Sequence, residues 1–333
     1  MIQKDFWHSS KVGIIGGGSW GTVLAHLASK NCREVRVWLR GEELVRAFNS
    51  TRMNSHYVPE IQLNERVHAY SSLERLFEGG LDAIIWALPS EVCRSQAQKV
   101  ATLVQGDEIF IHATKGIEAG TLKRMSEVLS EELPSRRIGV MSGPNLAHEV
   151  ARGEPAATVI ASAFTEVCEA GKALFSNEGF RTYTDTDVIG VEWAGALKNI
   201  LAIASGALDA LKCGWNTRAM FITQGLNEMV RFSVAMGAKE STFLGLAGIG
   251  DLLATCSSPL SRNYRVGFRL AQGESLDVIL KDLGTTAEGV RTTQSVWEFA
   301  SKRDISMPIT EKVYRLLKEE ISVKEALRNF NRN

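Results

Sequence analysis

The sequence predicts an α/β N-terminal domain with a parallel, doubly wound sheet, followed by an all-α C-terminal domain. Over roughly the first 185 residues, short apolar, β-branched segments alternate with helix-like segments, the pattern of a parallel α/β sheet. From Glu192 onward helical periodicity dominates and strand signals vanish. We place the boundary so that the domains are 1–188 and 189–333, in line with a length of 333 residues, enough for about two domains.

The expected strands of the first domain are short segments separated by helices. Several are nearly continuous apolar runs, which is typical of central strands covered on both faces. We expect strands at 11–16, 34–39, 82–89, 108–114, 137–143 and 156–162, and helices at 20–30, 91–104, 121–132 and 165–175.

Composition excludes several classes of protein. Lys+Arg and Asp+Glu both number 38, and a net charge of zero argues against nucleic acid as the main partner. Five scattered cysteines without a C-x-x-C pair indicate neither a disulfide framework nor a metal site. No apolar run reaches the ~20 residues that span a bilayer, and the polar N-terminus does not resemble a signal peptide. We therefore expect a cytoplasmic protein without metal or an integral membrane segment.

A glycine-rich turn follows the first strand and opens a helix. It contains Gly16-x-Gly18-x-x-Gly21, in which one glycine makes the tight turn, one lets the backbone approach a pyrophosphate, and one lets the helix pack on the strand. The helix N-terminus then offers free N–H groups and a positive dipole end to the phosphates. The motif predicts a Rossmann dinucleotide-binding domain; the alternative is a glycine-rich turn in a cofactor-free sheet.

The end of the second expected strand bears on the choice of cofactor. An Asp or Glu there would bind the ribose hydroxyls of NAD, but this sequence has Leu39-Arg40-Gly41 and no carboxylate before Glu42. Arg40 could pair with a 2′-phosphate. This favours NADP(H), with NAD(H) as the second choice. Alternatively, Arg40 is a solvated strand end or stacks on adenine.

One charge interrupts the apolar stretch WAGALKNILAIASGAL, which runs from Trp193 to Leu208. This charge is Lys198, and a lysine among apolar residues is destabilising unless it has a partner or a task. It could instead lay its stem along the helix and reach water with its head. As a general acid, its ammonium group would supply both a proton and positive charge to a developing alkoxide.

A second cluster, at residues 245–270, has the features of a phosphate site. Glycines in 245–250 place Asp251 at a helix start, and Ser261 reads as the N-cap of the next helix. Arg262 and Asn263 follow in its first turn, where a cation and an amide suit a small phosphate. A solvated basic face is the alternative.

Two further segments follow strands, where open α/β sheets place ligand groups. Lys115 lies in HATKGIE, and SGPNLAHEV spans residues 142–150. Each lysine alone is most simply a surface charge. Combined with a nicotinamide, Lys115, Lys198 and Asp251 point to a carbonyl-reduction site.

Six blocks in this order resemble bacterial NAD(P)-dependent glycerol-3-phosphate dehydrogenase, over about Lys11 to Ile321: GGGSWGT, TKGIE, SGPN-A-EV, EWAGALKNILAIA, GLAGIGDLLATCSS and SRNYRVG. The resemblance implies interconversion of dihydroxyacetone phosphate and sn-glycerol 3-phosphate, feeding glycerophospholipid synthesis. It also implies a homodimer. Some positions depart from the family's pattern. Asn145 stands where Ser or Thr is usual, and its amide can still donate a hydrogen bond. Thr-Ala stands before Glu288 where the family tends to have valines.

The resemblance also implies roles for individual residues. Lys198 would be the acid/base, with Lys115 and Asp251 as catalytic companions. Substrate contacts would be Lys115, Gly143, Asn145, Lys198, Asn199, Asp251, Ser261, Arg262 and Asn263. Cofactor contacts would be Gly16, Gly18, Ser19, Trp20, Gly21, Arg40, Lys115, Ala147, Arg262, Thr286 and Glu288.

Two other functions compete with this one. A related two-domain dehydrogenase acting on a hydroxy acid would share the fold, and turnover of carboxylate substrates would identify it. A dinucleotide-sensing protein without turnover would keep the glycines but would have no reason to keep Lys115, Lys198, Asp251 and Arg262 together.

Overall fold

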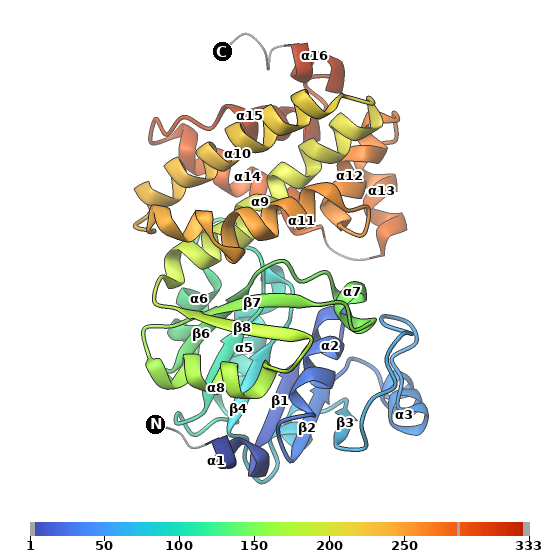
Figure 1. Cartoon of the computed structure of the whole chain (residues 1–333), viewed down its shortest axis with the longest axis vertical. Helices are drawn as coiled ribbons and strands as arrows, with labels where there is room; N and C mark the ends of the chain where they lie inside the picture. The colour runs from blue at the N-terminus through green and yellow to red at the C-terminus, as the bar shows by residue number, and fades with distance from the viewer. Residues whose placement is uncertain (1–3, 285–286, 329–333) are drawn as a thin grey trace. The chain divides into compact units, whose positions relative to one another are not determined.

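An eight-stranded sheet forms the first part of the molecule in the computed structural model, which describes residues 4–284 and 287–328. The strand order is β3-β2-β1-β4-β5-β6-β7-β8 (Figure 1). The strands are β1 (Lys11–Ile15), β2 (Glu34–Trp38), β3 (Val67–Tyr70), β4 (Ala83–Trp86), β5 (Ile109–His112), β6 (Ile138–Ser142), β7 (Ala156–Ala161) and β8 (Phe180–Asp185). The helices between them are α1 (Lys4–Ser9), α2 (Ser19–Ala28), α3 (Glu42–Thr51), α4 (Leu73–Phe77), η1 (Ser90–Val92), α5 (Cys93–Ala101), α6 (Met125–Glu132), α7 (Ala147–Ala151) and α8 (Thr165–Phe175).

The sheet is doubly wound, as the sequence predicts. Successive side chains of a strand point to opposite faces, so Ile14 and Ile85 join one core cluster while Ile15 and Ile84 join another. Helices α2 and α8 contribute to the first core, and α4, α5 and α6 to the second. Both faces of the central strands are therefore buried, which explains why they read as continuous apolar runs.

Three features of the sheet differ from the expectation. Strands β3 and β8 were not expected, and β7 pairs antiparallel with β6, with Val140 opposite Ala161. Both unexpected strands lie at the edges of the sheet, and β8 has the mixed sequence FRTYTD with Arg181, Tyr183 and Thr184 exposed. The connection from β6 to β7 holds only the short helix α7, and the chain turns back instead of crossing over.

The remaining elements are helical: α9 (Val188–Ala210), α10 (Trp215–Ala235), η2 (Glu240–Leu244), the π-helical turn η3 (Leu246–Gly250), α11 (Asp251–Ser257), α12 (Arg262–Ala271), α13 (Leu276–Leu283), α14 (Glu288–Ser301), α15 (Pro308–Leu317) and α16 (Val323–Arg328). Helix α9 runs through their common core. It crosses α12 at a close backbone approach, because a Cβ on Gly206 would lie 1.9 Å from the oxygen of Tyr264 and one on Gly267 would lie 1.7 Å from that of Ile203.

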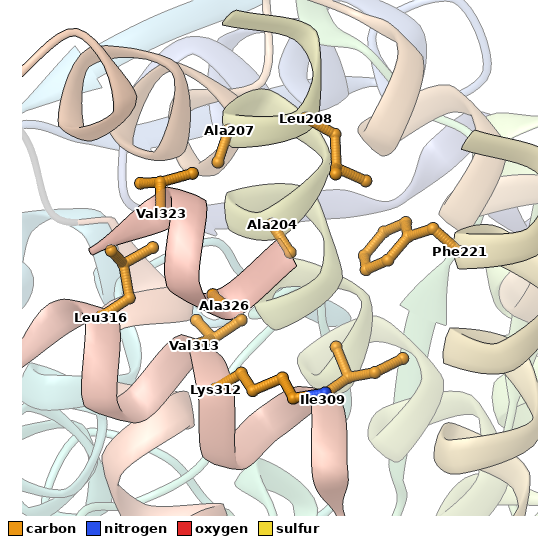
Figure 2. Close-up of a pocket in the computed structure, with 10 residues that line it drawn as sticks. All are labelled: Ala204, Ala207, Leu208, Phe221, Ile309, Lys312, Val313, Leu316, Val323 and Ala326. Atoms are coloured by element: carbon orange, nitrogen blue, oxygen red, sulfur yellow. The ribbon is translucent and has the colours of Figure 1, made fainter. Parts of the chain in front are cut away.

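Within the described residues, α9 alone is long and apolar enough to cross a membrane. Of its most apolar 18-residue stretch, 83% is buried inside the protein. An apolar pocket lies beside it, lined by α9, α10, α15 and α16 (Figure 2). Ala204, Phe221, Val313 and Ala326 contribute to its walls, and Lys312 is its one charged lining residue.

The chain divides into two compact units by its contacts. The nucleotide unit comprises the residues up to Thr114 together with Met125–Val188, and the helical unit comprises Lys115–Arg124 together with the chain from Ile189. The segment Lys115–Arg124 thus lies within the first half of the sequence but packs with the second unit. Here the expected helix 121–132 starts only at Met125.

Candidate functional site

The glycine-rich turn has the geometry that its sequence predicts. Gly16 has a φ of +111°, and a Cβ there would lie 2.6 Å from the oxygen of Ala87. A Cβ on Gly21 would lie 1.8 Å from the oxygen of Gly16, so helix α2 can pack on the turn only through glycine. A Cβ on Gly18 would meet nothing within 4 Å. The turn is therefore closed on the protein side and open at Gly18.

This open side fits the pyrophosphate of a dinucleotide. Gly18 is the N-cap of α2, no side chain caps the helix there, and its first turn carries no acidic residue. The first N–H groups and the helix dipole are thus available to an anion. Ser19 and Trp20 begin the same helix; the Ser19 hydroxyl donates to the oxygen of Tyr57, 3.2 Å away, and Trp20 packs on Phe180.

Asn54 is a residue of this site that the sequence analysis missed. Its buried amide donates to the oxygen of Gly17 (2.9 Å) and to the hydroxyl of Thr22 (2.8 Å). It thereby ties the loop after α3 to the glycine-rich turn and fixes the orientation of one of its peptide groups. No local pattern reveals this, because the partners lie 32 and 37 residues away.

Other expected cofactor and substrate residues of the nucleotide unit lie after strands. Arg40 is exposed between β2 and α3. Gly143 follows β6, and the Asn145 amide lies 2.9 Å from the Thr158 hydroxyl. Ala147 begins α7.

In the helical unit, two lysines converge on one carboxylate. Lys115 Nζ lies 2.7 Å from one oxygen of Asp251, and Lys198 Nζ lies 3.2 Å from the other. The side chains of Lys198 and Asp251 are 6% and 3% exposed. Two ammonium groups share one negative charge here, so the cluster is net positive when both are protonated and suits an anionic substrate or a developing alkoxide.

Burial dominates the acidity of Lys198. It lowers the pKa of Lys198 to about 8; Asp251 opposes this shift and Lys115 adds to it. A lysine with a pKa near neutrality can both donate and accept a proton in working conditions. The snorkelling alternative does not describe Lys198, because its side chain is only 6% exposed and its Nζ contacts Asp251.

Local structure explains how these groups meet. A π-helical turn precedes Asp251, and a Cβ on Gly248 would come within 2.3 Å of the backbone of Phe243, so this tight packing requires glycine. Thr255, one turn after Asp251, receives a 2.5 Å hydrogen bond from Lys198 Nζ and lies 3.3 Å from Asp251 Oδ1. Thr255 was not predicted from the sequence, although its i+4 spacing from Asp251 places both on one helix face.

The expected phosphate residues lie at one helix start. Ser261 caps α12, its hydroxyl accepting from the N–H of Tyr264 at 3.3 Å. Asn263 Oδ1 accepts from the N–H of Gly289 at 3.0 Å, which leaves its NH₂ group as the donor that a phosphate needs. Arg262 begins the helix and its side chain is exposed.

Packing joins this helix start to the lysine cluster. A Cβ on Gly289 would lie 2.6 Å from the oxygen of Asn199 and 2.8 Å from Asn263 Oδ1. Asn199, which neighbours Lys198, donates to the backbone oxygen of Lys115 at 3.0 Å. Glu288 begins α14 beside Gly289. Thr286 lies outside the described residues.

A doubly wound sheet with an open glycine-rich turn, joined to a unit with a buried lysine–carboxylate cluster, defines the class of nicotinamide-dinucleotide-dependent oxidoreductases. Family models place the chain more narrowly. Residues 11–168 match the model for the N-terminus of NAD-dependent glycerol-3-phosphate dehydrogenase, and residues 187–328 match the model for its C-terminus. The chain belongs to the glycerol-3-phosphate dehydrogenase family, and the resemblance predicted from the sequence is confirmed.

Individual relatives match nearly the whole length of this chain. A glycerol-3-phosphate dehydrogenase [NAD(P)+] of Geobacter sulfurreducens is 43% identical over 96% of both chains. One from Enterococcus faecalis is 42% identical, covering 96% of this chain and 95% of the relative. The crystal structure of the glycerol-3-phosphate dehydrogenase of Coxiella burnetii matches with a TM-score of 0.93 at 35% identity, over 98% of this chain and 100% of that one. A ketopantoate reductase of Ralstonia eutropha, at 17% identity and a TM-score of 0.60, shares the fold alone.

Proposed function

We propose that this chain interconverts dihydroxyacetone phosphate and sn-glycerol 3-phosphate, with Lys198 as the acid/base. The observation that carries this assignment is the buried contact of Lys198 and Lys115 with Asp251. Family membership supports the substrate, since the relatives are named for glycerol 3-phosphate. The donor groups of Arg262 and Asn263 at the start of α12 support a phosphorylated one.

The chemistry follows from where the protons lie. When bound, the dinucleotide supplies the hydride that adds to C2 of the ketone. The carbonyl electron pair moves to oxygen, and Lys198 Nζ gives that oxygen its proton and becomes a neutral amine. Asp251 and Thr255 hold the nitrogen in place through contacts of 3.2 and 2.5 Å. In the reverse direction the neutral amine takes the hydroxyl proton.

The remaining side chains position the substrate. Lys115, held 2.7 Å from Asp251, offers positive charge to the developing alkoxide. Arg262 and Asn263 bind the phosphate, with Ser261 capping their helix and Asn199 fixing the backbone of Lys115. Gly143 and Asn145 contribute further substrate contacts. For the dinucleotide we assign Gly16, Gly18, Ser19, Trp20, Gly21, Arg40, Lys115, Ala147, Arg262, Thr286 and Glu288.

We infer a preference for NADP(H) over NAD(H). Arg40 follows β2 with its side chain exposed, and no carboxylate precedes Glu42 in this turn. A guanidinium attracts a 2′-phosphate, whereas a carboxylate would repel it. Arg40→Asp should lower the ratio of kcat/KM with NADPH to that with NADH by at least tenfold; an unchanged ratio would refute this role of Arg40.

Family resemblance also supports a cytoplasmic homodimer whose product feeds glycerophospholipid synthesis. Sedimentation of the full chain tests the dimer, because its mass should be twice that of the 36.5 kDa chain. A single species at the chain mass over the working concentration range would exclude it.

The first experiment follows NADPH and NADH oxidation with dihydroxyacetone phosphate. Lys198→Ala should lower kcat by about 10²–10⁴-fold, the typical effect of losing a general acid. NADPH binding should persist. Lys302→Ala, an exposed lysine of the same unit, is the control and should keep full activity. Tight NADPH binding without turnover would instead identify a dinucleotide sensor, and turnover of a hydroxy acid alone would identify a different dehydrogenase.

A further inference from the structure

The segment Lys115–Arg124 is a short loop attached to the helical unit at both of its ends. At one end, Asn199 donates to the backbone oxygen of Lys115. At the other, Arg124 Nη1 lies 2.6 Å from Glu192 Oε2, in an ion pair whose side chains are 14% and 3% exposed. Between the ends, Ile117 and Leu122 are buried in the core around α9.

The backbone of this loop links its two ends mechanically. Ile117 and Arg124 form an antiparallel bridge, and the N–H of Glu118 donates to the oxygen of Lys123 at 2.9 Å. Leu122 has a φ of +59°, which is unfavourable for a branched side chain. The conformation therefore depends on its contacts with the helical unit, and a displacement of Arg124 would be transmitted across the bridge toward Lys115.

Both attachment points lie on one face of α9. Glu192 and Asn199 are seven residues apart, which is two helical turns or about 10 Å along the axis. Lys198 lies between them on the same helix. The helix that carries the acid/base thus also holds the loop that carries its neighbour Lys115.

A buried ion pair is a poor device for stability alone, since apolar residues of similar volume often serve as well. Because its hydrogen-bonded geometry is directional, the Arg124–Glu192 pair is better suited to holding the loop 115–124 in one conformation. We propose that the Arg124–Glu192 pair is a positioning device that holds Lys115 against Asp251. This rests on the proposed function only in giving Lys115 a role in turnover; the attachment of the loop is independent of it.

The test replaces both members of the pair, so that neither is left facing the other's missing charge. In the double variant Arg124→Met/Glu192→Leu, kcat with dihydroxyacetone phosphate should fall at least tenfold, with a smaller change in the KM for NADPH. The pH profile should move as well, because Lys115 lowers the pKa of Lys198. With Lys115 displaced, the fall in reduction rate at alkaline pH should shift to higher pH, an effect that a purely structural pair would not produce.

A readout without turnover accompanies the kinetics. Amide hydrogen exchange over residues 115–124 should be at least tenfold faster in the double variant, while β1 and α2 keep their wild-type rates. Arg124→Lys keeps a charge and should recover part of the lost kcat. Arg94→Met, which removes two ion pairs of the nucleotide unit, with Glu131 and with Glu132, is the control and should leave both kcat and exchange in 115–124 unchanged.

Two results would overturn the proposal: unchanged exchange in residues 115–124, or faster exchange with unchanged kcat and pH profile. A wild-type chain that fails to reduce dihydroxyacetone phosphate would instead refute the proposed function. In that case the exchange measurement would still decide whether the pair holds the loop.

Discussion

Lys198 illustrates how a single residue can be chosen from sequence and explained only by structure. Its isolation in an apolar helix marks it as unusual, but the sequence does not say where its head goes. In the folded chain the head is buried against Asp251 and Thr255. The proposed acid/base role therefore depends on contacts of Lys198 with residues more than fifty positions away in the chain.

The pH dependence of both directions follows from the pKa of Lys198, about 8. Ketone reduction needs the ammonium form, so kcat/KM should fall as pH rises through about 8. Alcohol oxidation needs the neutral amine, so its kcat/KM should rise over the same range. Initial rates from pH 6 to 10 measure this. Lys115→Met should move both limbs to higher pH, because it removes a positive charge that lowers the pKa of Lys198; a shift to lower pH would contradict the cluster.

Cysteine reactivity tests another part of the same environment. Burial raises the pKa of the Cys256 thiol to about 12, and Cys32, Cys93 and Cys168 are also buried, whereas Cys213 is partly exposed. Since the thiolate is the reactive form, Cys213 should be the first thiol of the native chain to be alkylated. Peptide mass spectrometry after brief iodoacetamide treatment identifies the modified residue. Rapid labelling of Cys256 would show that its surroundings are open.

At the scale of elements, sequence patterns predict the buried parts well and the edges poorly. Strand β4 is apolar throughout and β1 is apolar after Lys11, so the identity of these central strands is clear. Strand β8 carries three exposed residues and is recognised only by its pairing with β7. The late start of α6 has a similar cause: residues before Met125 form a loop held by α9, which local helix propensity cannot anticipate.

The loop after α3 should control cofactor affinity through Asn54. Asn54→Ala removes two buried hydrogen bonds at the glycine-rich turn, and leaving buried partners unsatisfied costs about 1–3 kcal/mol. We expect the Kd for NADPH, measured by fluorescence, to rise about tenfold with little change in kcat.

Asn49→Ala is the matched control, because its amide also makes two backbone hydrogen bonds, but with Ala69 in edge strand β3. It should destabilise the fold without a comparable loss of NADPH affinity. Equal losses of affinity in the two variants would show that Asn54 acts only through general stability.

Helix α15 begins on a side chain from another helix. Met307 at its N-cap offers no side-chain acceptor, and Glu228 of α10 accepts instead from the N–H groups of Ile309 and Thr310, both at 2.8 Å. Glu228→Ala should lower the free energy of unfolding by about 2–4 kcal/mol, since these two N–H groups and the Thr310 hydroxyl lose a buried carboxylate acceptor. Urea unfolding measures this. Glu311→Ala, at a side chain that is 41% exposed on the same helix, should change it by less than about 0.5 kcal/mol.

For the whole molecule, each unit has a core of its own, and a ligand should stabilise the unit that binds it. NADPH at a hundredfold excess over its Kd should add about 2.7 kcal/mol to the unit that contains the glycine-rich turn. Calorimetry of the full chain should therefore show the transition of that unit at a higher temperature. Asn54→Ala should reduce this rise in unfolding temperature at a fixed NADPH concentration. An undiminished rise would show that Asn54 does not contribute to NADPH binding.

The fold class and the family follow from the whole sequence because six separate blocks agree. Thr255 was marked only by its i+4 spacing from Asp251, and Asn54 and Glu228 were beyond reach for a common reason. Each of these two acts through a partner that tertiary structure brings to it, and neither stands out from the residues beside it in the chain.

The path of the chain between its two units sets a limit on how the protein can be divided. The chain passes from one unit to the other after Thr114, returns after Arg124, and leaves again after Val188. A cut at the third passage alone therefore frees neither unit intact. A fragment starting at Ile189 would lack Lys115 and would expose the core surface that Ile117 and Leu122 cover. Any attempt to graft this helical unit onto another nucleotide-binding scaffold has to carry both pieces, joined by linkers at three points.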